Sequence, residues 1–151
     1  MFTGWGMPAR LRKATVTRVP LSLPTDIDPE QDTYAEIRQA RIGENVRRAE
    51  MTKSIERTFD PNSSLISIKT SWNYEDQRAM EVYLTLAGTN LLDENGEPYF
   101  AFRRDRQTGE MHFDGTFEDF RRRWDALPLV IADAFVQAVY QVNPEWDPNR
   151  K

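Results

Sequence analysis

Few residues in this sequence have the type and spacing that catalysis needs. The single histidine, His112, has Asp114 two residues on, so both side chains lie on one face if the segment is a strand. A general base also needs a nucleophile or a substrate pocket beside it, and no nucleophile is spaced to join this pair. The acidic stretch 93–97 departs from the spacing of an EF-hand loop and is better explained as a turn. We therefore expect no catalytic residue, no cofactor site, no metal site and no enzymatic activity.

Two clusters of arginines, at 103–106 and 121–123, lie close to aromatic residues. Aromatic rings beside arginines can grip single-stranded nucleic acid. Here, however, Phe100, Phe102 and Trp124 fall on the apolar faces of their predicted elements, which favours a place in the core. The net charge of −4 also opposes binding to a phosphate backbone. A nucleic-acid partner is therefore not expected, although a small nucleic-acid-binding regulator is kept as an alternative function.

Length and composition indicate one folded unit. A chain of 151 residues with 39% hydrophobic content can bury a core without help from disulfides or metals. The absence of cysteine fits a reducing compartment, and the broken, basic N-terminus does not look like a signal sequence. The most apolar stretch, near the C-terminus, is too short and polar to span a bilayer. A cytoplasmic protein without membrane segments is expected.

Charge divides the chain near residue 25. Residues 1–25 contain basic residues and no acid, and a run of acids follows from Asp26. Alternating residues around Val19 predict an extended segment, and Pro20 restricts it to a sheet edge or a free arm. We expect a basic extended arm over 1–25 and a single mainly helical domain over 26–151.

The remaining pattern predicts an α+β fold that is mainly α, with a short β-hairpin. Helical residues run from about 30 to 59, with a slip of phase at Gly43, and a short strand is expected at 65–72. Asn73 is a candidate N-cap for a helix that ends near Gly88. A hairpin is predicted around Thr108-Gly109, a capped helix after Thr116, and a last helix from Pro128 to about Asn143.

The last helix is apolar around most of its circumference. Asp133, Gln137 and Gln141 form one narrow polar stripe, and the core face lies opposite them. Three further apolar residues beside the core face make the apolar arc wider than an ordinary surface helix needs. We expect this excess surface to bind a partner or a second copy of the chain, with Trp146 as a further candidate. The predicted partner-binding residues are Leu129, Val136, Tyr140 and Trp146.

Over residues 78–143 the order of segments resembles the tail assembly chaperones of long-tailed bacteriophages. In that family a helix runs into a Leu-rich segment, an Asp-Glu-x-Gly turn and an aromatic pair, matched here by Asp93, Glu94, Gly96 and Phe100. A short acidic helix and an apolar last helix follow, comparable to 117–143. The hairpin-like segment "RRDRQTGEMHFDG" is an insertion that departs from this pattern.

The resemblance implies a non-catalytic protein of the host cytoplasm. Such a chaperone coats the long tape measure protein, keeps it soluble, helps to recruit tail-tube subunits and leaves before the particle matures. A structural virion component, such as a head–tail connector or a tail-completion subunit, is the main alternative. In that case the apolar helix would pack against identical neighbours.

Overall fold

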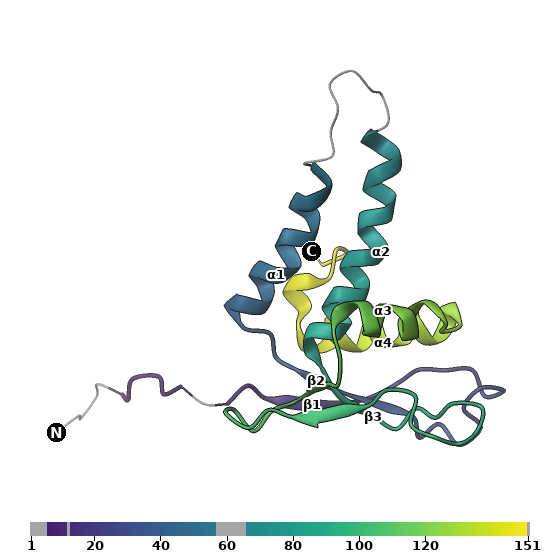
Figure 1. Ribbon diagram of the computed structural model, residues 1–151. Coiled ribbons are helices and arrows are strands. Elements are labelled where there is room, and N and C mark those ends of the chain that lie inside the picture. Colours follow the sequence, from purple (N-terminus) through teal and green to yellow (C-terminus); the bar gives the residue numbers. More distant parts are fainter. Residues whose placement is uncertain (1–5, 12, 57–65, 151) are drawn as a thin grey trace.

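A three-stranded antiparallel sheet forms the base of this computed structural model, which describes residues 6–11, 13–56 and 66–150 (Figure 1). Its strands are β1 (Val16–Pro20), β2 (Tyr34–Arg38) and β3 (Leu86–Thr89), in the order β1-β2-β3. The central strand alternates in a way that a half-buried sheet requires, because Ala35 and Ile37 point into the core. The sheet is therefore covered by helices on one face.

Helices rise from this sheet and lie across it (Figure 1). The long helices α1 (Ile42–Glu56) and α2 (Ile66–Thr85) project together away from the sheet, while α3 (Phe117–Asp125) and α4 (Leu129–Val142) lie across its covered face. A short 3₁₀ helix, η1 (Pro144–Trp146), follows α4. Helix α2 contacts both α1 and α4, so it links the projecting pair to the layer above the sheet.

The predicted hairpin is confirmed as β4 (Phe102–Arg104) and β5 (Met111–Phe113), which pair in antiparallel register beside β3. Gly109 has a φ of 75°, a left-handed conformation that favours glycine at this turn. The carboxylate of Asp105 accepts hydrogen bonds from the backbone N–H groups of Gln107 and Thr108. These local bonds position the arginines of the hairpin.

Stacked aromatic rings fill the core between the hairpin and α3. The ring of Phe120 stacks on Phe100 at 5.2 Å and on Trp124 at 5.9 Å between centroids. Helix α3 begins where the sequence predicts, because Thr116 and Asp119 form a reciprocal capping box. The expectation that Phe100 and Trp124 are core residues is confirmed, since both are buried.

The α+β fold with a small hairpin is confirmed, but the helix predicted over 30–59 is wrong in its first part. Tyr34–Arg38 is the central strand of the sheet, and the helix begins only at Ile42. The slip of apolar phase near Gly43 had suggested two helical pieces that meet there. It instead marks the change from strand to helix between Arg38 and Ile42. Residues 57–59 lie outside the described part of the chain.

The predicted boundaries of the next two elements are also wrong. Residues 66–72, expected as a strand, belong to α2. Asn73 therefore lies inside that helix and does not cap it. Leu65, the first residue of the expected strand, is outside the described residues. The helix ends at Thr85, and Gly88 lies in β3 opposite Glu36. A Cβ atom at Gly88 would approach the Glu36 carboxylate to 2.7 Å, so the missing side chain leaves room for this cross-strand neighbour.

The N-terminal arm is shorter than predicted. Strand β1 lies at the sheet edge, as Pro20 indicates, and Leu21 and Leu23 beyond it are buried in the core. Residues 16–23 are therefore part of the folded body. Of the described residues before them, residues 6–11 extend away from it, with Met7 and Leu11 exposed (Figure 1).

The exposure predicted for the four partner-binding candidates on α4 and η1 is wrong at three of them. Val136, Tyr140 and Trp146 are only 3%, 8% and 3% exposed, whereas Leu129 is 68% exposed. Helix α2, the sheet and η1 cover the extra apolar arc, so the polar stripe and the first turn are what remains outside. The apolar width of α4 thus reflects its central place in this chain.

This burial predicts opposite outcomes for two substitutions on α4. We expect Val136→Asp to lower the free energy of unfolding by about 4 kcal/mol, because it buries an unpaired carboxylate. Leu129→Asp on the same helix should change it by less than about 0.5 kcal/mol, because that side chain is in solvent. Urea denaturation followed by circular dichroism measures both. Equal stability of the two variants would contradict the buried position of Val136.

Candidate functional site

The guanidinium of Arg38, at the end of β2, is buried at the junction of several elements. Its Nη1 donates to the Met111 carbonyl at 2.9 Å, and its Nη2 donates to the Leu84 carbonyl at 2.5 Å. Nη2 also lies 3.4 Å from the Glu44 carboxylate and 3.2 Å from Nδ1 of His112. Its Nε has no hydrogen-bond partner among the described residues. Arg38 thus connects β2 to the end of α2, the start of α1 and strand β5.

Beside Arg38 lies a cavity of about 760 Å³ between α1, the end of α2 and the hairpin. Tyr83, Leu84 and Phe113 supply its apolar wall, and Glu44 and Asp105 are its acidic residues. The cations outnumber these acids. They are Arg38, Arg47, Arg103, Arg104 and Arg106, with His112 as a further titratable group.

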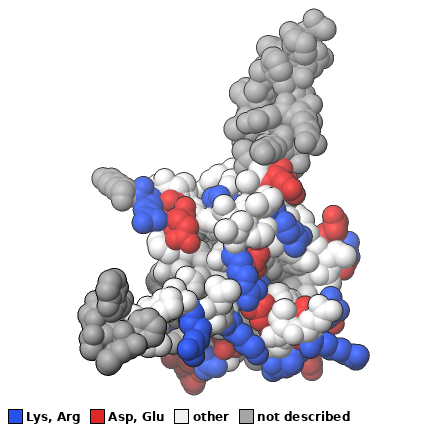
Figure 2. Space-filling view, turned by 90° about the vertical axis from the view of Figure 1, so that its left-hand side faces the viewer, with Lys and Arg blue, Asp and Glu red and all other residues white. Residues whose placement is uncertain are grey.

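Figure 2 looks at the side of the molecule where Figure 1 places α1 and the hairpin. Lys and Arg side chains gather over the lower part of this face, with Asp and Glu side chains among them (Figure 2). The arginines of the cavity differ in how they are engaged. Arg104 donates to the Gly109 carbonyl, and Arg103 lies 3.8 Å from the Asp114 carboxylate. Arg47 and Arg106 form no ion pair within the described part of the chain, so their N–H groups can donate to a ligand. The guanidinium carbon of Arg47 lies over the Tyr83 ring, 5.8 Å from its centroid.

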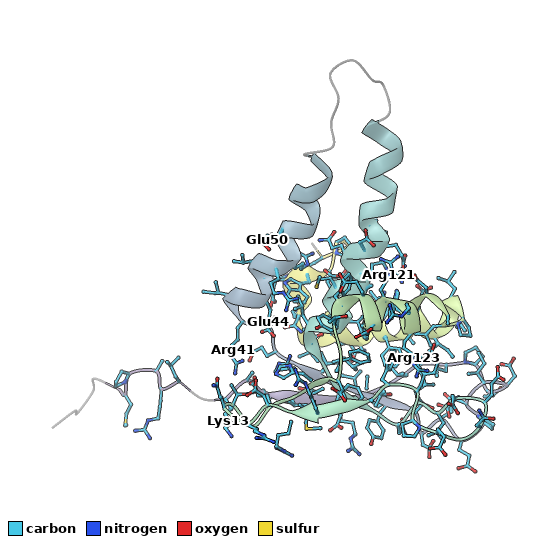
Figure 3. All side chains as sticks on the ribbon, in the orientation of Figure 1. Lys13, Arg41, Glu44, Glu50, Arg121 and Arg123 are labelled. Atoms are coloured by element: carbon cyan, nitrogen blue, oxygen red, sulfur yellow. The ribbon has the colours of Figure 1, made fainter. Side chains whose placement is uncertain are left out.

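The pair of Arg41 and Glu110 holds the hairpin against the start of α1. Both carboxylate oxygens of Glu110 accept from the Arg41 guanidinium, at 3.0 and 2.5 Å. These bonds lower the pKa of Glu110, because they favour its charged form. The backbone N–H of Arg41 also donates to Glu44, and Figure 3 shows these two residues together at the base of α1. The ion pair of Arg41 and Glu110 thus holds the hairpin and α1, which form two walls of the cavity, next to each other.

His112 is held neutral by its surroundings. Burial lowers its pKa, and the charge of Arg38 lowers it further, although Glu110 opposes both. Because Nδ1 faces an Arg38 donor, the proton of the neutral ring belongs on Nε2. Asp114, expected beside His112, pairs with Arg103 instead. His112 therefore serves as a hydrogen-bond acceptor in the cavity wall.

The cationic groups of the cavity have the chemistry to bind an anion. Guanidinium groups offer forked donors that match carboxylate or phosphate oxygens.

The described residues contain no group of three or more His, Cys, Asp or Glu side chains placed to hold a metal ion. Within the same residues, no helix is both long enough and apolar enough to cross a membrane.

The two predicted arginine clusters lie in different parts of the structure. The cluster at 103–106 meets Arg38 and Arg47 in the cavity. The cluster at 121–123 lies on α3, where Arg121 binds Asp76 and Asp125 and Arg122 binds Asp119. Of the predicted partner-binding residues, none lines the cavity. Arg38 and Arg47 were missed because both were assigned to the solvated, charged face of the helical stretch 30–59. The alternation of residues 34–38, which is typical of a strand, was the available signal.

Comparison of the chain with protein-family models, curated proteins and solved structures gives no match. The function of the cavity is therefore inferred from its own residues.

The role of Arg38 as a structural anchor is testable by substitution. We expect Arg38→Met to lower the free energy of unfolding by about 3 kcal/mol, since it leaves the carbonyls of Leu84 and Met111 without donors. Arg104→Met, at an exposed hydrogen bond, should cost less than about 1 kcal/mol. Denaturant unfolding monitored by tryptophan fluorescence measures both. A loss no larger for Arg38→Met than for Arg104→Met would contradict the anchor.

The neutral state of His112 predicts a pH dependence. NMR titration of the imidazole proton should give a pKa below the ordinary value of 6.5. Because the unfolded chain then binds the proton more readily than the folded protein does, acidification from 6.5 down through the lowered pKa should reduce stability. His112→Gln should remove this contribution. A measured pKa above 6.5 would show that the carboxylates outweigh burial and Arg38.

Proposed function

We propose that this protein is a non-catalytic tail assembly chaperone of a long-tailed bacteriophage, acting in the host cytoplasm. Its client would be the tape measure protein, or another tail protein, during tail morphogenesis. The observation that best supports a binding function is the open cavity. In it, arginine N–H groups that are not used in ion pairs lie opposite an apolar wall. The order of helix, acidic turn and apolar last helix supports the choice of family.

Client binding does not need the buried arc of α4, because α1 offers exposed apolar residues. Ile42 and Val46 are 84% and 49% exposed and lie one turn apart on the same face of α1. Glu44 and Arg47 project from the opposite side of this helix toward the cavity. A client could therefore contact α1 on its apolar side while a charged segment enters the cavity on the other.

One observation favours the structural alternative, a head–tail connector or tail-completion subunit. Strand β1 has no neighbour on its outer side among the described strands. The backbone groups of Thr15 and Leu21 form hydrogen bonds with the segment that contains β2. The backbone N–H and C=O groups of the alternate residues of β1 therefore point to the outer side of the sheet. A second copy could add a strand there and begin a ring, although Pro20 lacks the N–H that a continuous ladder needs.

Co-expression tests the proposed function. The client to use is the product of the long, helix-rich reading frame beside this gene, produced with and without the present chain. We expect the client to be soluble and to co-purify only when the chaperone is present, because a holdase shields apolar surface. Mass spectrometry of purified particles should find no copy of the chaperone.

A fixed copy number in mature particles would overturn the chaperone and favour the structural subunit. Failure of the client to co-purify, combined with oligonucleotide binding that weakens steeply with salt, would favour the nucleic-acid regulator.

A further inference from the structure

We propose that the basic cavity binds the carboxylate side chains of an acidic protein segment that also carries an apolar residue. That the segment belongs to the tape measure protein rests on the proposed function. The chemical class of the ligand rests on the cavity alone.

Charge provides the first argument. Five arginines line the cavity against two acids, and Arg47 and Arg106 have no ion pair with any other described residue. Lys13, at the end of the N-terminal arm, adds a further cation at the hairpin turn, as Figure 3 shows. Its Nζ lies 3.3 Å from the position that a Cβ atom on Gly109 would take. Cations that outnumber acids in a partly enclosed space attract an anionic group more strongly than an open surface does.

Guanidinium groups in and beside this cavity already hold carboxylates. Arg38 in its wall faces Glu44, and Arg41 outside the lining binds both oxygens of Glu110. Both interactions use guanidinium donors, which match planar carboxylates in a way that a lysine does not. An entering glutamate or aspartate would find the same type of donor at Arg47 and Arg106.

The volume and the apolar wall limit the ligand to a few side chains. About 760 Å³ is within the usual range for sites that hold small ligands or short peptide stretches. Leu84 and Phe113 are buried, so Tyr83, which is partly buried, is the apolar lining residue with surface left to cover an apolar side chain next to the acidic ones. An acidic segment with an aromatic or aliphatic residue would use both kinds of wall.

Nucleic acid fits this site less well. A phosphate backbone follows a continuous basic track and stacks its bases on exposed rings. Here the exposed carboxylate of Asp114 stands beside Arg103, and Phe113 is 7% exposed. A nucleic acid strand extending beyond the cavity would meet this acid, whereas short carboxylate side chains would not.

A binding assay with the full chain tests the proposal. The probe is a fluorescein-labelled peptide with glutamates on both sides of a central phenylalanine, and its control replaces each glutamate with glutamine. Fluorescence anisotropy should show the acidic peptide binding at least about tenfold more tightly than the glutamine peptide or a short oligothymidylate, because charge-assisted hydrogen bonds are lost in the control.

Two double variants then locate the site. Arg47→Gln with Arg106→Gln should weaken binding of the acidic peptide by at least about tenfold, since both open guanidinium groups are removed. Arg122→Gln with Arg123→Gln removes the same charge from α3 and should leave binding within about twofold. Circular dichroism and melting temperature confirm that both variants are folded, as expected for exposed side chains.

Several results would overturn the cavity assignment. These are equal binding of the glutamine peptide, tighter binding of the oligothymidylate, or equal effects of the two double variants. Self-association abolished by the cavity variant, without peptide binding, would identify a second copy as the occupant and also overturn it.

The chaperone function can fail separately. Client capture by wild type that the cavity variant leaves unchanged would refute the cavity and keep the chaperone. Peptide binding that depends on the cavity, without any client capture, would support the cavity and refute the chaperone.

Discussion

Burial of the Arg38 guanidinium is the constraint on which the arrangement of this protein depends. A charged group removed from water must be given hydrogen-bond acceptors, or folding becomes costly. Arg38 finds them in the carbonyls of Leu84 and Met111, which belong to the end of α2 and to β5. Its own carbonyl accepts from the buried side chain of Asn143, whose amide oxygen also accepts from the Ala40 N–H. Three distant parts of the chain are therefore held around this one residue, and two of them, the end of α2 and β5, also bound the cavity.

A second buried polar cluster holds α1 in place. Glu81 accepts hydrogen bonds from Arg48 and from the Tyr140 hydroxyl, and Trp146 donates to Asn45. Burial raises the pKa of Glu81, while the bonds from Arg48 and Tyr140 oppose that rise. Helix α1 thus depends on polar contacts as well as on apolar packing. This explains how it can expose apolar side chains to solvent and still present Arg47 at the cavity.

The residues that stabilise the fold and the residues that are exposed lie in different parts of the molecule. The aromatic stack, the apolar arc of α4 and the Glu81 cluster are enclosed by the chain itself, so they have little surface left for a partner. The groups that remain available lie at the periphery, on the hairpin, the outer face of α1 and the N-terminal arm. Charged and apolar side chains therefore reach the surface at these places while the core stays covered.

The sequence by itself determined the elements whose signals lie within a few residues. The turn at Gly109, the capping box of Thr116 and Asp119, and the limit that Pro20 sets on β1 all act locally, and so does the stop of α4 before Pro144. The class of fold and the placement of the aromatic rings in the core followed from the same local periodicities.

Tertiary structure decided the features that depend on distant neighbours. Tyr34–Arg38 becomes a strand because β1 and β3 pair with it, although nearby residues favour helix. Val136 and Tyr140 are core because α2, the sheet and η1 surround α4, and the width of an apolar arc cannot reveal whether its cover comes from the same chain. The cavity likewise exists only because Arg38 and the hairpin, more than sixty positions apart in the chain, converge where a buried charge needs acceptors.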